Sequence, residues 1–195
     1  SYVADIVVAD DLNLSSISQV YKNGKLVCEN GTALFECETV DNSKVTNTVH
    51  LPKISADFFK TDVKDKFDAI ELIPESIITK KVTVSYSDSL SKVCVIERHH
   101  NLGTTGIGFV TNYGITNGAI ATSIGHDSHN VIVIGDNDSD MALAVNTLGT
   151  SGGIAVCSEG KVIASMTLDI AGLMSVKSAD EVTREHDNLY SAAKV

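Results

Sequence analysis

Two short apolar runs, 118–124 and 131–134, bracket a polar segment, His126-Asp-Ser-His-Asn130, and this arrangement limits what the chain can become. Apolar runs of this length, bounded by polar residues, are typical of strands. A second polar segment, Asp136-Asn-Asp-Ser-Asp140, follows directly and opens a helical pattern. Binding and catalytic groups concentrate on loops that rigid elements hold in place. These two polar segments are therefore the first candidates for a functional site.

The helical pattern covers residues 139–148 and has a clear start and end. Asn137, with Asp140 three residues later, is similar to a capping box, and Gly149 follows the last periodic residue. A helix that packs on a core needs one apolar face. Such a face is formed here by Met141, Ala144, Val145 and Leu148.

Strand patterns account for most of the chain beyond residue 66. A short helix is expected around 55–59, and a final helix starts with the capping box Ser178-Ala-Asp-Glu181 and runs to about Lys194. These patterns predict an α+β fold with a largely antiparallel sheet and a few helices. The expected strands are 67–73, 77–86, 92–98, 106–113, 118–124, 131–134, 153–157 and 161–166.

The first 45 residues form a separate β-rich segment. Residues 20–28 predict a hairpin, because Asn23-Gly24 is the residue pair that a type I′ turn prefers. The apolar area of this segment is too small to support an independent sheet. We expect residues 1–45 to be part of a larger β-domain, 46–66 to be a linker and 67–195 to be the main domain. The chain also begins without Met, directly in a strand pattern, so we expect a fragment of a longer protein.

Composition excludes several classes of partner. The chain is 43% hydrophobic, which is enough for a core, and carries a net charge of −10. Nucleic acids and anionic membranes require clustered Lys and Arg, so neither is an expected partner. Four cysteines without a CxxC pair indicate reduced thiols in a cytoplasmic protein rather than disulfides or a structural zinc site.

The segment 126–130 allows two interpretations. His126 and His129 could hold a metal on a helix or tight turn, although a third ligand such as Asp127, Asp136 or Glu97 would be required. The alternative is a hydrogen-bonded loop in which Asp127 and Asn130 cap backbone groups. The spacing of the two histidines alone does not decide between them.

The segment 136–140 resembles the start of a calcium loop only superficially. Met141 stands where such a loop needs Gly, and Thr147 stands where it needs Glu. Capping of the following helix by carboxylates is the better explanation. The calcium interpretation is therefore rejected.

Four ionisable residues, Glu97-Arg-His-His100, follow the apolar run 93–96. They are either an exposed strand end or part of a site. The glycines between 103 and 108 precede a strand pattern, whereas a phosphate-binding loop must lead into a helix. We expect one polar surface around 97–100, 126–130 and 136–140, without a complete catalytic set.

The order of several motifs resembles the C-terminal domain of bacterial adenine deaminases over roughly residues 67–194. The motifs that carry this resemblance are Glu97-Arg-His, Thr105-Gly-Ile-Gly-Phe-Val, Gly118-Ala-Ile-Ala, His126-Asp-Ser-His-Asn-Val-Ile-Val-Ile-Gly, Gly152-Gly and Ile170-Ala-Gly-Leu-Met-Ser. Residues 1–45 resemble the strands that complete a β-sandwich after the barrel of amidohydrolases.

The resemblance implies a hydrolase that converts adenine to hypoxanthine and ammonia in purine salvage. In such enzymes a pair of divalent metal ions, manganese or iron, lies in a barrel and activates the water that attacks C6 of the purine. The barrel begins its ligand set with an HxH strand. None of the six histidines of this chain forms that pattern; they are His50, His99, His100, His126, His129 and His186. We therefore expect the metal centre to lie outside this chain and the chain to be inactive alone.

Three roles remain open for the domain. It could close over the purine site of a homo-oligomeric enzyme, exclude water and place polar groups near the adenine ring. It could instead be a scaffold for oligomerisation, or an independent module that binds small ligands. For the first role, the candidate residues that face the barrel are Glu97, Arg98, His99, His126, Asp127, Ser128, His129 and Asn130.

Overall fold

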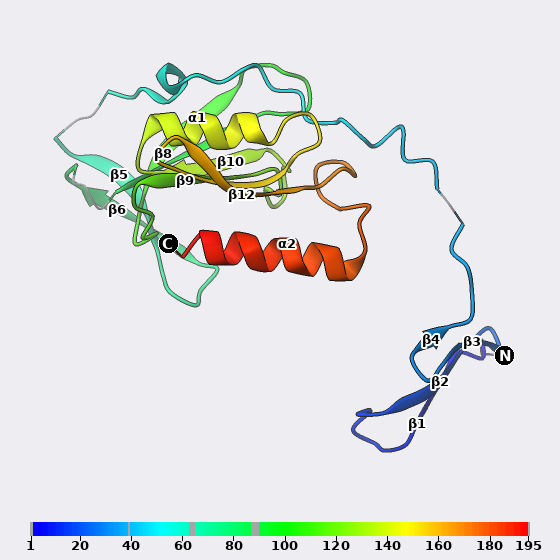
Figure 1. Cartoon of the computed structure of the whole chain (residues 1–195). Helices are drawn as coiled ribbons and strands as arrows, with labels where there is room; N and C mark the ends of the chain where they lie inside the picture. The colour runs from blue at the N-terminus through cyan, green and yellow to red at the C-terminus, as the bar shows by residue number, and fades with distance from the viewer. Residues whose placement is uncertain (1, 39, 63–64, 87–89, 195) are drawn as a thin grey trace. The chain divides into compact units, whose positions relative to one another are not determined.

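The computed structural model describes residues 2–38, 40–62, 65–86 and 90–194 and divides the chain into two compact units, 1–41 and 42–195. Each unit contains one sheet (Figure 1). Both sheets are mostly antiparallel, which confirms the predicted α+β class. In the larger sheet, the exception is a parallel pairing of β5 with β8.

The first unit is a four-stranded antiparallel sheet in chain order. Asn23 and Gly24 join the second and third strands with φ angles of 52° and 75°, as a type I′ turn requires. Apolar side chains such as Ile6, Val7 and Phe35 remain exposed, so this sheet lacks a core of its own. The strands are β1 (Ile6–Ala9), β2 (Ile17–Lys22), β3 (Lys25–Glu29) and β4 (Thr32–Ala33).

The second unit is built on an eight-stranded sheet with the order β12-β11-β9-β10-β7-β8-β5-β6. All expected strands beyond residue 66 are present, with ends shifted by a few residues. They are β5 (Phe67–Leu72), β6 (Thr79–Val84), β7 (Ser91–Ile96), β8 (Thr105–Thr111), β9 (Gly118–Thr122), β10 (Val131–Gly135), β11 (Gly153–Ser158) and β12 (Lys161–Thr167).

The helices α1 (Asp138–Thr147) and α2 (Ala179–Ala192) cover opposite faces of this sheet (Figure 1). Alternation along a strand separates the two faces, since successive side chains point to opposite sides. On β11, Ala155 and Cys157 belong to the core beneath α1, whereas Val156 belongs to the smaller core beneath α2. The result is a three-layered domain.

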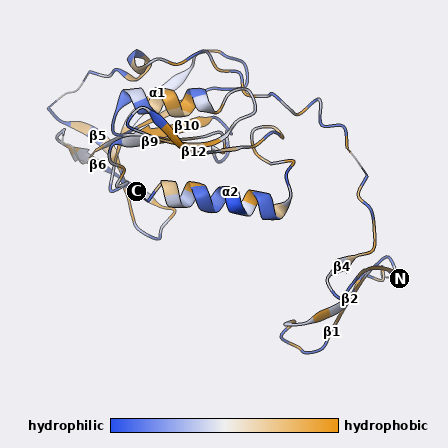
Figure 2. Ribbon diagram, viewed as in Figure 1, coloured by the Kyte–Doolittle hydropathy of each residue, from blue (hydrophilic) through white to orange (hydrophobic). Residues whose placement is uncertain are grey.

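Both helices begin as the sequence predicts. The Asn137 side chain accepts a hydrogen bond from the backbone N–H of Asp140 at 2.8 Å. Ser178 and Glu181 form a complete capping box at the start of α2. All four predicted apolar residues of α1 are buried, whereas α2 is mainly hydrophilic and buries Leu189 (Figure 2).

Cys94 and Cys157 are buried and free, as expected for core thiols. Burial raises the pKa of Cys157 to about 11, with a further contribution from the nearby Asp140 carboxylate. At neutral pH this thiol therefore stays protonated and unreactive. No helix among the described residues is long and apolar enough to cross a membrane.

Part of the segment expected to be a linker, 46–66, packs in the core of the second unit. Val49, Ile54 and Phe59 are buried there, and Phe59 belongs to the short 3-10 helix η1 (Ala56–Phe59). The Asn146 side chain at the end of α1 bridges the backbone of this segment. It accepts a hydrogen bond from Ile54 N at 3.0 Å and donates one to Ile54 O at 2.7 Å.

Replacing Asn146 by Ala is expected to lower the free energy of unfolding by about 1–3 kcal/mol, because two part-buried backbone groups of Ile54 lose their partner. Urea unfolding measures the loss. The control is Thr147→Val, which removes a bond to Leu143 O within α1 and one to the Cys157 thiol but leaves Ile54 untouched. An equal loss in both variants would contradict the anchoring role of Asn146.

Candidate functional site

Antiparallel pairing gathers several loops at one end of the larger sheet. Ile96, the last residue of β7, pairs with Val131, the first residue of β10. Thr122, the last residue of β9, lies opposite Ile132 and Ile154 near the starts of β10 and β11. The segments that extend from this end are therefore 97–104, 123–130 and, after β12, 168–178.

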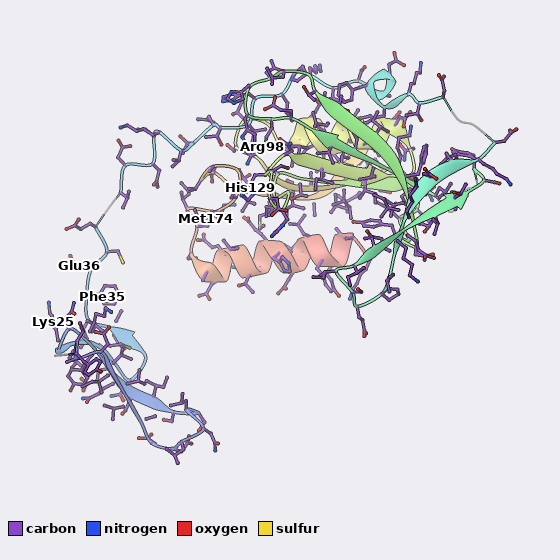
Figure 3. All side chains as sticks on the ribbon, turned by 180° about the vertical axis from the view of Figure 1, so that it is seen from behind. Lys25, Phe35, Glu36, Arg98, His129 and Met174 are labelled. Carbon is purple, nitrogen blue, oxygen red and sulfur yellow. The ribbon has the colours of Figure 1, made fainter. Side chains whose placement is uncertain are left out.

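Arg98 lies at the centre of these loops, and its side chain is buried with 2% exposure. The guanidinium donates one hydrogen bond from Nε to the carbonyl of His129 and another from Nη2 to the carbonyl of Ala171 at 2.9 Å. Figure 3 shows Arg98, His129 and Met174 together at this end of the domain. A single side chain therefore connects the loop 123–130 with the loop 168–178.

Burial lowers the pKa of the Arg98 guanidinium from its usual high value, and no carboxylate among the described residues forms an ion pair with it. Arg nevertheless keeps its charge in proteins. Backbone carbonyl dipoles supply the acceptors that a buried charge needs. The positive charge of Arg98 therefore strengthens its hydrogen bonds to the two loops.

Ser123 reinforces the same junction from the end of β9. Its hydroxyl donates to the carbonyl of Gly172 and accepts a hydrogen bond from Gly153 N at 2.8 Å. A Cβ atom at Gly172 would lie 2.7 Å from Nη1 of Arg98, and the φ angle of Gly172 is +69°. Both the space and the backbone conformation therefore require glycine at this position.

The segment 126–130 is a tight loop and not part of a helix or strand. His129 N donates to Gly125 O at 2.7 Å, and Asp127 and His129 have φ angles of +67° and +51°. Such angles are uncommon for residues other than glycine and are frequent at functional sites. Ser128 Oγ accepts from Asn130 N at 3.4 Å, so Ser128 provides the side-chain cap that we expected from Asp127 and Asn130.

Most side chains of this loop face solvent, although Arg98 holds its backbone through the carbonyl of His129. His126 and Asp127 have side-chain exposures of 96% and 89%, and His126 Nδ1 lies 2.9 Å from Asp127 Oδ1. His129 and Ser128 are also exposed, whereas Asn130 is half-buried. The loop therefore presents a carboxylate and two imidazoles on a backbone that hydrogen bonds hold, and these groups can donate or accept hydrogen bonds.

The strand end 97–99 touches this loop directly. His99 Nε2 lies 3.0 Å from the carbonyl of Ser128 and donates to it when protonated. The Glu97 carboxylate accepts hydrogen bonds from the backbone N–H groups of His99, His100 and Leu102 at 2.6, 2.8 and 3.0 Å. These bonds lower the pKa of Glu97. Glu97 thus stabilises the loop 97–104. Arg98 and His99 connect this loop to the loop 126–130.

The second polar segment lies elsewhere, so the expectation of one polar surface that includes 136–140 was wrong. It follows Gly135, the last residue of β10, at the opposite end of that strand from 126–130. Asp136 accepts a hydrogen bond from Gly118 N at 2.9 Å, and Asp140 accepts one from Gly160 N at 2.8 Å. Both carboxylates thus bind backbone N–H groups of neighbouring loops, whereas the cap of α1 is the amide oxygen of Asn137 and not a carboxylate, as we had expected.

Sequence reasoning missed Ser123, Ala171 and Gly172 as parts of the site. Ser123 follows directly on the strand β9, and the other two residues were noticed only within the family motif 170–175. Within the described ranges, no three or more His, Cys, Asp or Glu side chains are arranged to hold a metal ion. These residues therefore do not fit a metal centre.

Glu97→Gln is expected to lower the melting temperature at neutral pH, because an amide oxygen accepts the three backbone hydrogen bonds less well than a carboxylate does. The folded-state pKa of Glu97 is depressed below 4.5, so its contribution is complete above that pH and is lost as the pH falls through the folded value. The gap between wild type and variant should therefore close in acid. Thermal melts from pH 7 to 3 measure it, with exposed Glu159→Gln as the control; a gap independent of pH would refute the assignment.

Comparison with known proteins supports the resemblance seen in the sequence. The family model described as "Adenine deaminase C-terminal domain" matches residues 71–195. The chain is 39% identical to adenine deaminase 2 of Carboxydothermus hydrogenoformans, over 97% of this chain and 35% of that protein. It is 40% identical to an adenine deaminase of Clostridium acetobutylicum, over 93% of this chain and 34% of the relative.

A third relative, an adenine deaminase of Lysinibacillus sphaericus, is 35% identical over 98% of this chain and 36% of its own length. The chain therefore spans about a third of the length of the curated relatives that it matches. The family match covers more than half of the chain and includes the loops around Arg98. The chain thus belongs to the adenine deaminase family and contains its C-terminal domain.

Proposed function

We propose that this chain is the part of an adenine deaminase that shapes and closes the purine site, in an enzyme that hydrolyses adenine to hypoxanthine and ammonia. The supporting observation is the loop 126–130, whose backbone is fixed by buried Arg98 while His126 and Asp127 stay exposed. The positive φ angles of Asp127 and His129 make this loop a tight turn that carries its polar side chains outward.

The geometry suits contact with the edge of a purine. Adenine presents ring nitrogens and an exocyclic amino group, and these need both donors and acceptors. The Asp127 carboxylate accepts hydrogen bonds, whereas the imidazoles of His126 and His129 can do either. Closing such a loop over a site excludes water and strengthens each polar contact.

The proposal assigns the metal ions to another part of the enzyme. The described residues bring no three or more His, Cys, Asp or Glu side chains together that could hold a metal ion. A manganese or iron pair would belong to the barrel that family resemblance implies. In the same proposal the enzyme is a cytoplasmic homo-oligomer in purine salvage, which suits the acidic charge and free cysteines.

A scaffold for oligomerisation is the second candidate function. Its support is the first unit, where apolar side chains of β1 such as Ile6 and Val7 are exposed. Exposed apolar surface of this kind marks contact with another chain or domain. The two candidate functions predict different effects of the exposed residues of 126–130. A role in the purine site makes turnover depend on them, and a scaffold role does not.

In a full-length adenine deaminase that contains this chain, Asp127→Ala and His129→Ala are expected to lower kcat/KM by roughly 100-fold, the usual scale for a misplaced active-site group. The matched control is His186→Ala, since His186 and Asp187 form another exposed neighbouring His–Asp pair, on α2. Steady-state kinetics with adenine and a melting curve are recorded for each variant. Loop variants that match the control in kcat/KM would favour the scaffold.

A complementation assay separates the candidates further. The chain alone is expected to show no adenine deamination, and activity should appear when it is mixed with the separately expressed remainder of the enzyme. Ammonia release measures both. Full activity of the remainder without this chain would leave the domain no role in the purine site.

A further inference from the structure

We propose that Arg98 is a positioning residue of the deaminase, which holds the loops 123–130 and 168–178 as one unit in the arrangement that accepts the purine. This inference rests on the proposed function and deepens it. Arg98 is 2% exposed, so it acts through the loops rather than by touching the substrate.

The guanidinium of Arg98 has a rigid geometry. Its planar fork carries donors in fixed directions, and two of them reach carbonyls that are far apart in the chain, those of His129 and Ala171. A Lys side chain has one ammonium group and cannot reproduce this fork. The spacing of the two loops is thus set by a rigid group of fixed width.

Both carbonyls that Arg98 bonds belong to residues in the left-handed backbone region. His129 has a φ angle of +51°, and Ala171 has one of +56°. Such angles are uncommon for residues other than glycine. The hydrogen bonds from Arg98 are made to these same two residues, so the residue that binds the loops also holds their unusual conformations.

The residues around Arg98 are closely packed. Gly152 and Gly172 leave no room for a Cβ atom, which would lie 2.7 Å from Ser123 Oγ or from Arg98 Nη1, respectively. Ser123 bonds the carbonyl of Gly172, next to the carbonyl that Arg98 bonds. A junction packed this tightly transmits a displacement of one loop to the other.

The experiment uses Arg98→Lys in the full-length enzyme, with Asp127→Ala and the double variant. Hydrogen–deuterium exchange is expected to quicken in both loops of Arg98→Lys together and in neither loop of Asp127→Ala. Each single change is expected to lower kcat on the order of 100-fold. The double variant should lie within about threefold of the worse single, because both act through the same loop.

The core variant Val133→Ala controls for stability, since it weakens the sheet at a buried residue of β10 away from the loops. It should lower the melting temperature without changing kcat of the folded enzyme. Faster exchange in one loop only or in neither, or additive losses in the double variant, would overturn the positioning role. If instead Asp127→Ala and His129→Ala leave kcat/KM unchanged, the proposed function itself fails.

Discussion

The structure of the candidate site depends on the buried guanidinium of Arg98, which binds two backbone carbonyls. Buried charge is costly unless it is fully solvated by the protein. Two of the five N–H donors of Arg98 bond the carbonyls of His129 and Ala171, so these loops close around the charge and supply acceptors for it. The loops are thus positioned by the electrostatic requirement of one side chain.

The rest of the domain provides the frame for this contact. The register of the antiparallel strands brings the ends of β7, β9 and β12 together, and the helices on the two faces of the sheet keep it rigid. The segment around Ile54 is tied to α1 through Asn146. A fixed frame of this kind lets loops of irregular conformation keep exposed polar groups in place.

Local features of the fold were predictable from the sequence. The apolar face of α1 and the capping box at Ser178 depend on spacings of three and four residues, which can be read directly. The loop 126–130 and the strand end 97–99 were also identified as neighbours. The hydrogen bonds of Arg98 to His129 and Ala171 were not predictable, because no local pattern encodes which backbone carbonyl a side chain reaches.

The lack of a local pattern for long-range contacts explains why the position of 136–140 and the role of Arg98 were not predicted. The segments 126–130 and 136–140 were predicted to form one surface because they are close in the chain. The strand β10 lies between them and places them at opposite ends of the sheet. Arginine is rarely buried, so the sequence gives no reason to place Arg98 inside. The roles of Ser123 and Gly172 depend on that burial and could not be recognised before it.

The long reach of the Arg98 contacts has a consequence for how the domain forms. His129 and Ala171 lie 31 and 73 positions from Arg98 along the chain. The bond to Ala171 spans more of the chain than any pairing between strands of the larger sheet, in which paired residues are at most 43 positions apart. During synthesis, α1 and its neighbouring strands emerge before residue 171 does. The junction can therefore be completed only after every strand of the larger sheet has been synthesised.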